Sequence, residues 1–324
     1  MNLLITGGSG YVGTRLIFKL IEKNINIHNY DVSLFGDEHL PIKENFYYHK
    51  KDLRDTDSFR DVISNHKIDI VLHLACISND PTFELNSKIS KEINYDAFEP
   101  IVKISKELGV KKFIYASTCS VYGVSEKKDV TEEHPLLPIT DYNKFKALCE
   151  PVLKNYIDEN FHGIIIRPAT VCGYSEKMRF DLSVNILTNF AYNKGYIKVF
   201  GGNQLRPNCH IDDMCDLYER LIFEDFGHLN GEIFNVGSEK TNRIGRIFKL
   251  ISSITKFKGK LKVETKRVRP SKSEVVKLHS SSKKFKLLFK WKTKTNLREG
   301  LKKTIDWYIK NQKLFQKDYN KYSI

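Results

Sequence analysis

Strand and helix signals alternate along the first half of the chain. Residues 2–6 are apolar enough for a buried strand, and the run YVGTRLIFKLIEKN that follows is amphipathic at helical spacing. The runs DIVLHLAC and KKFIYAS are almost continuously apolar, as in strands buried on both faces of a parallel sheet. We expect further strands over 25–31, 46–50 and 163–168, and helices over 55–66, 86–109 and 141–160. This alternation, with right-handed crossovers, predicts an α/β fold with a doubly wound parallel sheet.

One expected helix contains a proline. Residues 86–109 place an apolar stripe on one face, and Gly109 is suited to end the helix. The stripe consists of Ile93, Ala97, Ile101, Ile104 and Leu108. Because Pro100 lacks an N–H group, it should kink this helix or mark a local break.

Beyond Arg167 the pattern loosens. Helices are expected over 182–193, 213–224, 243–254 and 296–311, with short strands such as IKVF and EIFNV between them. There is no internal repeat and no low-complexity linker, so a smaller mixed α/β C-terminal lobe should pack against the first. The predicted domains are 1–166 and 167–324, and the position of the boundary between them is approximate by several residues.

Composition excludes several classes of protein. The 324 residues are 28% charged and 41% hydrophobic, which excludes a disordered chain, and no apolar run approaches the roughly 18 residues of a membrane span. The first strand follows Met1 directly, leaving no room for a secretory signal. The six cysteines are scattered, without close pairs or metal-ligand spacing. We therefore expect reduced thiols, a cytoplasmic protein and no metal site.

Positive charge is concentrated near the end of the chain. Residues 240–324 hold 26 Lys and Arg against 5 Asp and Glu, whereas the formal net charge of the whole chain is +14. Only 12 of the 53 basic residues are Arg, and the lysines are dispersed, as in KFKGKLKVETKRVRPSK. Because nucleic-acid readers use arginine and interspersed aromatic residues, this pattern favours a solvated lysine-rich face and no nucleic-acid partner. The functional alternative is attraction of a polyanion such as a nucleotide diphosphate.

A glycine-rich turn joins the first strand to the first helix. The sequence is Thr6-Gly7-Gly8-Ser9-Gly10-Tyr11-Val12-Gly13. Such glycines let the backbone approach a pyrophosphate, and the N-terminus of the helix offers N–H groups to the phosphates. Asp31, which is 18 residues beyond Gly13 at the end of the second strand, suits ribose hydroxyls and repels a 2′-phosphate. These features predict a Rossmann-type site for NAD rather than NADP.

A second motif places a phenol near an ammonium group. Tyr142 and Lys146 are four residues apart and share one face of a helix. A phenol with a pKa of about 10 is a poor base at neutral pH, but a nearby cation stabilises its phenolate form. By itself this spacing is common on exposed helices. The sequence also contains Thr118, at the end of the strand KKFIYAS, and the glycine turn. Their presence makes a catalytic role for Tyr142 and Lys146 the better interpretation.

Together these motifs resemble those of the extended short-chain dehydrogenase/reductases, specifically the NAD-dependent nucleotide-sugar epimerase/dehydratase family. The resemblance covers nearly the whole chain. Its further marks are Asp52-Leu53-Arg54, His73-Leu74-Ala75, STCSVYG at 117–123, RPATVCG at 167–173 and His210-Ile211-Asp212-Asp213.

The resemblance implies a set of cofactor residues and a set of substrate residues. Those expected to bind NAD are Gly7, Gly10, Tyr11, Val12, Gly13, Asp31, Asp52, Leu53, Leu74, Ala75, Tyr142 and Lys146. Those expected to contact a nucleotide-diphosphate sugar are Thr118, Cys119, Ser120, Tyr142, Asn185 and Arg206, the last through the diphosphate. Within these sets Thr118, Tyr142 and Lys146 are the catalytic residues, with Tyr142 as the base. Asp52 and Leu53 would contact adenine.

Two departures from the family pattern bear on the reaction. In the 4,6-dehydratases the active-site threonine is followed by Asp and Glu, whereas Cys119 and Ser120 stand here. Neither replaces the acid/base pair that removes water. The second diphosphate arginine of the family has no clear match: its place looks like Val276, with Arg269, Lys272 or Lys277 as substitutes. His279 is interpreted as structural.

The predicted function is NAD-dependent oxidation at C4 of a nucleotide-activated sugar, as a 4-epimerase or 4-dehydrogenase in surface-polysaccharide sugar biosynthesis. The alternatives are a 4,6-dehydratase, a 4-ketoreductase, which Asp31 disfavours, and a non-catalytic dinucleotide sensor. The family commonly dimerises through the helices matching 86–109 and 141–160, and both carry more apolar residues than one buried face requires. A homodimer is therefore expected.

Overall fold

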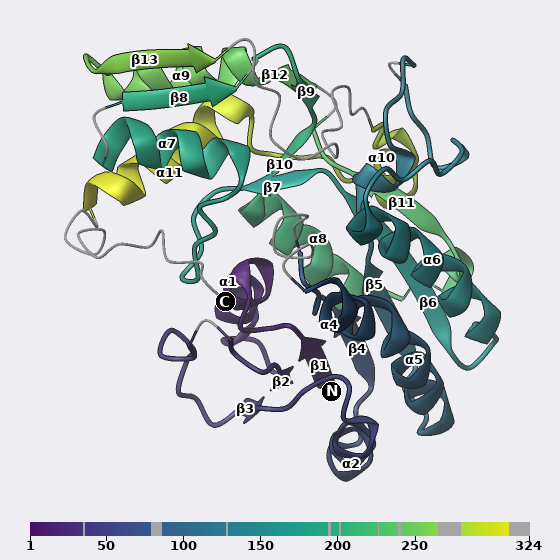
Figure 1. Ribbon diagram of the computed structural model, residues 1–324. Helices are drawn as coiled ribbons and strands as arrows, with labels where there is room; N and C mark the ends of the chain where they lie inside the picture. The colour runs from purple at the N-terminus through teal and green to yellow at the C-terminus, as the bar shows by residue number, and fades with distance from the viewer. Residues whose placement is uncertain are drawn as a thin grey trace.

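The computed structural model describes residues 1–34, 36–78, 86–127, 129–193, 196–200, 202–225, 227–238, 241–264 and 280–310. Within these ranges seven parallel strands form one sheet in the order β11-β6-β5-β4-β1-β2-β3 (Figure 1). They are β1 (Asn2–Thr6), β2 (Asn26–Tyr30), β3 (Phe46–His49), β4 (Ile70–His73), β5 (Lys112–Ala116), β6 (His162–Pro168) and β11 (Ile233–Val236). The doubly wound parallel sheet predicted from the alternating pattern is confirmed.

Helices cover both faces of this sheet. On one face α1 (Tyr11–Leu20) packs against α8 (Ile211–Phe223), and on the other α5 (Phe98–Glu107) packs beside α2 (Thr56–His66) and α6 (Asp141–Tyr156). The two cores follow the period-2 alternation of strand side chains. Leu3 and Ile5 belong to the core under α1 and α8, whereas Leu4 belongs to the core under the other helices.

The strand order fixes where a ligand can bind. β1 and β4 are neighbours, and from this pair the order runs outward to β3 on one side and to β11 on the other. In doubly wound sheets, ligands occupy the crevice beyond the carboxyl ends of the strands at such a switch point. The glycine turn follows β1, and Leu74 follows β4. Both predicted cofactor segments therefore lie at the switch point.

The predicted break at Pro100 is present. Residues 86–109 fold as α4 (Ser87–Lys91), a π-helical segment η1 (Glu92–Asp96) and then α5, whose first turn contains Pro100. The N–H of Ala97 donates to the carbonyl of Glu92 at 2.9 Å, which is the five-residue spacing of a π turn. Pro100 thus stands in the first turn of α5, where a missing N–H costs little.

The second lobe, at the top of Figure 1, has its own small core. It contains α7 (Ser183–Asn193), α9 (Ile244–Thr255), α11 (Leu297–Lys310) and the parallel pair β8 (Tyr196–Phe200) and β13 (Lys260–Glu264). Two shorter pairs join β7 (Thr170–Cys172) to β10 (Asn208–His210) and β9 (Leu205–Arg206) to β12 (Asn242–Arg243). α10 (Lys283–Phe289) contacts β11.

One grouping made from the sequence was wrong. The strand in EIFNV was assigned to the second lobe, but β11 pairs in parallel with β6 at the edge of the large sheet. α8, also beyond residue 167, covers α1. The chain therefore returns to the first lobe after building part of the second. The division into 1–166 and 167–324 stays a proposal about folding units.

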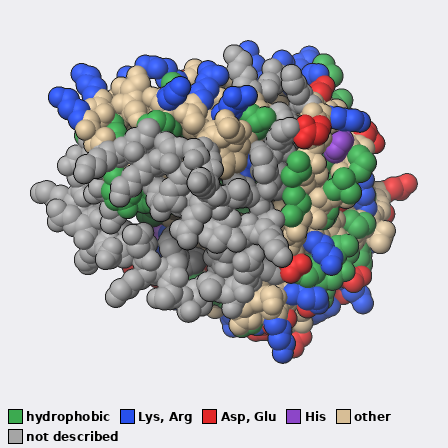
Figure 2. Space-filling view, turned by 45° about the horizontal axis from the view of Figure 1, so that its top comes forward, with side chains coloured by type: hydrophobic (Ala, Val, Ile, Leu, Met, Phe, Trp, Pro, Cys, Tyr) green, Lys and Arg blue, Asp and Glu red, His purple; other side chains and the backbone are tan. Residues whose placement is uncertain are grey.

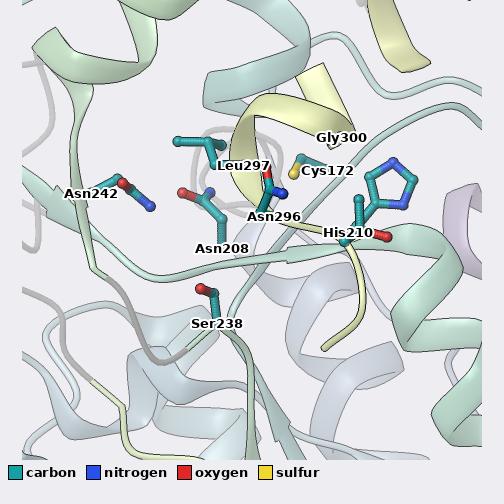
Figure 3. A pocket seen from close by; sticks show the side chains of 9 residues that line it. Cys172, Asn208, His210, Ser238, Asn242, Asn296, Leu297 and Gly300 are labelled. Carbon is teal, nitrogen blue, oxygen red and sulfur yellow. The ribbon is translucent and has the colours of Figure 1, made fainter. Parts of the chain in front are cut away.

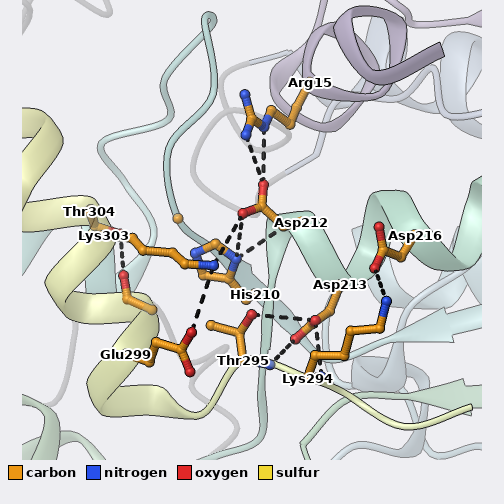
Figure 4. Close-up of polar contacts among 12 residues, drawn as sticks. Arg15, His210, Asp212, Asp213, Asp216, Lys294, Thr295, Glu299, Lys303 and Thr304 are labelled. Atoms are coloured by element: carbon orange, nitrogen blue, oxygen red, sulfur yellow. Dashed lines mark hydrogen bonds and ion pairs between the residues drawn. The ribbon is translucent and has the colours of Figure 1, made fainter.

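The excess positive charge of the last segment is matched partly within the molecule. Lys294 Nζ lies 2.9 Å from Asp216 of α8, and Lys303 Nζ lies 3.7 Å from Asp212 (Figure 4). Lys283 pairs with Asp129 at 2.7 Å. Other Lys and Arg side chains line the upper edge of the molecule in Figure 2. The basic segment thus serves as a counter-charge to the acidic first part as well as a solvated face.

In the part of the chain that is described, no helix has both the length and the apolar character needed to cross a bilayer.

Candidate active site

The glycine turn brings three backbone segments into close contact. Gly7 has a φ of +75°, and its N–H donates to the carbonyl of Tyr30 at 2.9 Å. A Cβ at Gly7 would stand 2.6 Å from the backbone of Ala75, and one at Gly13 would stand 2.5 Å from the Cα of Gly8. Only glycine permits this approach of the β4 loop and of α1 to the turn. The N-terminus of α1 is thereby held where a pyrophosphate binds, so the turn fits NAD.

Asp31 is tied to the glycine turn by hydrogen bonds. Its Oδ2 accepts from the N–H of Ser9 at 3.0 Å, and its Oδ1 accepts from the N–H of Ser33 at 2.8 Å. Burial raises the pKa of this carboxyl, while these two N–H donors oppose the shift. Each carboxylate oxygen has a further lone pair for a ribose hydroxyl. The position and remaining acceptor capacity of Asp31 fit the predicted ribose contact.

The other residues predicted to bind the cofactor differ in their burial and in the hydrogen bonds that they already make. Leu53 is 5% exposed and packs in the core under α2, and Asp52 accepts hydrogen bonds from Arg54, which lower its pKa. Leu74 donates its N–H to the carbonyl of Thr6 at 3.0 Å and is half-buried. Val12 packs against the core from the first turn of α1. Contacts of these residues with NAD stay predictions.

The three predicted catalytic residues come from adjoining elements. Thr118 caps the short helix η2 (Cys119–Tyr122), and its Oγ1 accepts from the N–H of Ser120 at 3.2 Å. Tyr142 is half-buried in the first turn of α6, and Lys146 lies one turn later. The Lys146 ammonium, 3% exposed, donates to the carbonyl of Ala116 at 2.7 Å, at the end of β5. The side chain of Lys146 is therefore held at the end of β5, two residues before Thr118.

Cys119 and Ser120 differ in their exposure. Cys119 is 1% exposed in the main core, and burial raises the pKa of its thiol to about 12, an effect that the charge of Arg206 opposes. The thiol is therefore neutral at physiological pH. Ser120 is half-buried. Arg206, on β9, is therefore within electrostatic range of Cys119 in the η2 segment.

Tyr11 and Asn185 join the two lobes. The Tyr11 hydroxyl donates to the carbonyl of Gly173 at 2.8 Å and accepts from Asn185 Nδ2 at 3.3 Å. Asn185 is fully buried, with its Oδ1 accepting from the N–H of Gly173 and its Nδ2 donating to the carbonyl of Arg179. Both residues organise the loop after β7 in this structure. Direct substrate binding by Asn185 stays a prediction.

Arg179 is a residue that the sequence analysis missed. Its Nε and Nη2 donate to the two carboxylate oxygens of Asp181 at 3.0 and 2.6 Å, and its Nη1 donates to Ser78 Oγ at 2.8 Å. The guanidinium also interacts electrostatically with the phenol of Tyr142. A cation that the sequence did not point to therefore interacts with the proposed base. The Arg-x-Asp spacing next to the β7 loop was the available signal.

Five residues considered in the sequence lie in a part of the chain that the structure does not describe. The proposed substitutes for the second diphosphate arginine, Arg269, Lys272 and Lys277, lie outside the described residues. The same holds for Val276 and His279.

A small polar pocket lies in the second lobe (Figure 3). Cys172, Asn208, His210 and Asn242 are among the residues lining it. The volume of the pocket is about 20 Å³. The Asn208 amide and His210 Nε2 are buried and make no hydrogen bond to any described group. A pocket of this size suits ordered water rather than a sugar nucleotide.

The chain is similar to a family model and to several known proteins. The family model described as the NAD dependent epimerase/dehydratase family matches residues 3–237. The dTDP-D-glucose 4,6-dehydratase of Homo sapiens is 27% identical over 333 residues, which cover 96% of this chain and 90% of that protein. The UDP-glucuronate 4-epimerase of Thermodesulfobacterium geofontis is 27% identical over 335 residues, covering 97% of this chain and 98% of that protein.

A solved structure extends the likeness to the fold. The UDP-glucose 4-epimerase of Thermotoga maritima, solved with UDP-glucose, superposes with a TM-score of 0.86. It is 26% identical, and the match covers 96% of this chain and 100% of that chain. The family resemblance that was inferred from the motifs is thereby confirmed.

Proposed function

Because this chain belongs to the NAD-dependent epimerase/dehydratase family, its cofactor is NAD, and we propose that it oxidises C4 of a nucleotide-diphosphate sugar. One observation supports the proposal: the Lys146 side chain on α6 donates to Ala116 at the end of β5, two residues before Thr118, and Tyr142 lies one turn earlier on the same helix. A dinucleotide sensor has no need of this set. We therefore assign an enzyme rather than a binding module.

Each catalytic residue has a defined task in this proposal. The Tyr142 oxygen removes the proton of the C4 hydroxyl. The Lys146 ammonium and the Arg179 guanidinium stabilise the phenolate form that does so. Thr118 Oγ1, which accepts from Ser120, still has a proton to donate to the reacting oxygen. When bound, NAD supplies the acceptor for the hydrogen on C4.

Two outcomes of the oxidation stay open. A 4-epimerase returns the hydrogen to the opposite face of the sugar, and a 4-dehydrogenase releases the 4-keto sugar. A 4,6-dehydratase, the activity named for the human relative, needs an acid/base pair after the threonine. The buried, neutral Cys119 thiol and Ser120 are poorly suited to that work. A 4-ketoreductase is disfavoured by Asp31, because such enzymes commonly prefer NADPH.

The test is a substrate screen with product analysis. Purified protein is given UDP-, GDP-, dTDP- and CDP-sugars while the absorbance of reduced nicotinamide is followed, and products are identified by NMR. We expect a C4-inverted or 4-keto sugar that retains its 6-oxygen. Tyr142→Phe should lower turnover at least about 100-fold with nearly unchanged NAD binding, and Thr118→Val should cost less. Formation of a 6-deoxy-4-keto sugar would overturn the proposal.

A further inference from the structure

Three histidines far apart in the sequence meet on one side of the first lobe. His28 lies in β2, His49 ends β3, and His66 ends α2. In Figure 1 these elements lie at the bottom of the view, whereas the second lobe lies at the top. The side chain of Asn29, the next residue along β2, donates to Ser9 in the glycine turn at 2.9 Å. Since successive strand side chains point to opposite faces, His28 faces away from the glycine turn.

The three imidazoles lie close together. One ring nitrogen from each lies within 4.8 Å of the other two. His28 Nδ1 and His49 Nε2 are 3.1 Å apart, and the ring of His66 is centred 4.5 Å from His28 and 5.1 Å from His49. Nitrogens that share a tetrahedral ion are about 3.3 Å apart, given metal–nitrogen distances of about 2.0–2.1 Å. The hydrogen-bonded pair already has nearly this spacing, and His66 would have to move its ring nitrogen closer to complete the site.

The surroundings offer an ion both donor atoms and access. His28 Nδ1 and His49 Nε2 share a hydrogen bond, and moving its proton to the other nitrogen of the same ring leaves both facing nitrogens with lone pairs for coordination. His28 is 2% exposed, but His49 and His66 are half-buried, and Tyr47, stacked on His28, is 40% exposed. An ion can enter from this solvent side.

We propose that His28, His49 and His66 form a binding site for a borderline divalent cation, with Zn²⁺ as the best match. Three neutral imidazoles are a common zinc donor set, with water in the fourth position. Bound there, the ion would tie β3, the edge strand, to β2 and to the end of α2. Because the site is on the face of β2 opposite the glycine turn, the ion would take no part in the proposed oxidation at C4. The proposal does not depend on the reaction.

The test uses the full-length protein after treatment with EDTA. Calorimetric titration with ZnCl₂ should show one ion bound per chain and a rise in melting temperature. His49→Gln and His66→Gln should each weaken zinc binding at least about 10-fold and abolish that rise. His228→Gln, at an exposed position of the short helix η3 (Gly227–Leu229), is the matched control and should bind zinc like the wild type. Unchanged NAD binding verifies that each variant is folded.

A spectroscopic arm separates imidazole from thiol ligands. Co²⁺ in place of Zn²⁺ should give the visible absorption of a four-coordinate site without thiolate charge-transfer bands. Sub-stoichiometric zinc binding, thiolate bands, or equal affinity of His49→Gln, His66→Gln and the control would each overturn the proposal.

Discussion

Glu150 and Arg167 form a buried bidentate ion pair. Arg167 Nε donates to Oε1 at 2.9 Å and Nη2 donates to Oε2 at 2.5 Å, and each side chain is 3% exposed. The hydroxyl of Ser117 also donates to Glu150 Oε1 at 2.6 Å. Because Ser117 precedes Thr118 and Glu150 follows Lys146 by one helical turn, this cluster fixes α6 against the ends of β5 and β6. The placement of the proposed catalytic residues on α6 and after β5 depends on this cluster.

Glu150→Gln should therefore destabilise the protein strongly. The substitution keeps the shape of the side chain but leaves the Arg167 charge buried without a counter-charge. Breaking one side of a buried pair typically costs about 3–5 kcal/mol of unfolding free energy. Urea denaturation measures this loss. Glu107→Gln, which breaks the exposed pair with Arg60, is the control and should have no measurable effect. Equal effects of the two substitutions would contradict the assignment.

Cofactor preference should change at Asp31. Removing its carboxylate in Asp31→Ser abolishes the repulsion of a 2′-phosphate, and Lys177, which interacts electrostatically with Asp31, stays beside the site. NADP should bind at least about 10-fold better, and NAD should bind more weakly through loss of charge-assisted hydrogen bonds. Fluorescence titration with both cofactors measures this. Glu38→Gln removes an exposed carboxylate near the same lysine and should leave the preference unchanged.

Stability should fall in mild acid because of His73. This residue is 3% exposed, its Nδ1 lies 2.9 Å from the Thr6 hydroxyl, and burial together with the charge of Lys146 lowers its pKa to about 3. The unfolded chain, with a histidine pKa near 6.5, binds the proton more readily. The contribution of neutral His73 to the free energy of unfolding is thus fully present above pH 6.5 and is lost as the pH falls towards 3.

The expected loss from His73 alone is about 2 kcal/mol between pH 7 and pH 5. Urea denaturation at the two values, for the wild type and for His73→Asn, isolates this contribution. The variant should show a correspondingly smaller difference between the two pH values. An identical difference in both proteins would show that His73 is not responsible.

We expect a homodimer formed through α4, α5 and α6. Leu148 on α6 and Ile89 on α4 are 38% and 39% exposed, and Tyr95 stacks on Phe145 at 5.4 Å between η1 and α6. Leu148→Lys should weaken dimerisation at least about 10-fold, since a charge would then enter the interface. Light scattering over a range of concentrations measures this. Leu287→Lys, at a 78% exposed position of α10, should have no effect. A concentration-independent wild-type monomer would contradict the expectation.

The sequence predicted those parts of the site whose chemistry is local. The glycine turn, Asp31 and the pair Tyr142 and Lys146 each lie within one turn or helix or at a strand end, so spacing along the chain reveals them. Strands β7, β9, β10 and β12 were not predicted, because strands of two or three residues have no measurable period. The periodicity of a strand also does not indicate which sheet the strand joins. For this reason β11 was assigned to the second lobe, although it pairs with β6 in the large sheet.

Contacts between distant residues could not be predicted for a different reason. Arg167 is 17 residues from Glu150, and Arg179 is 101 residues from Ser78, so only the folded chain brings them together. The same holds for the three histidines on β2, β3 and α2. Their separations, 21 and 17 residues, match no metal-binding motif.

Arg179 provides the most direct test of how the base is tuned. Its guanidinium interacts with the Tyr142 phenol while Asp181 and Ser78 hold it in place. A cation near a phenol favours the phenolate and so lowers the pKa of the phenol. We expect Arg179→Gln to reduce kcat and to move the acid limb of the pH–rate profile to higher pH. Arg179 acts here through Tyr142, as a positioning residue.

Conservative variants separate this electrostatic role from a structural one. Arg179→Lys keeps the charge without the bidentate contact and should restore part of the activity and of the pH profile. Asp181→Asn removes the opposing charge and should move the profile to lower pH, opposite to Arg179→Gln. NAD binding should be nearly constant across the three, because the glycine turn and Asp31 are untouched. If kcat falls in Arg179→Gln while the pH profile stays in place, the guanidinium only supports the β7 loop and the electrostatic role is excluded.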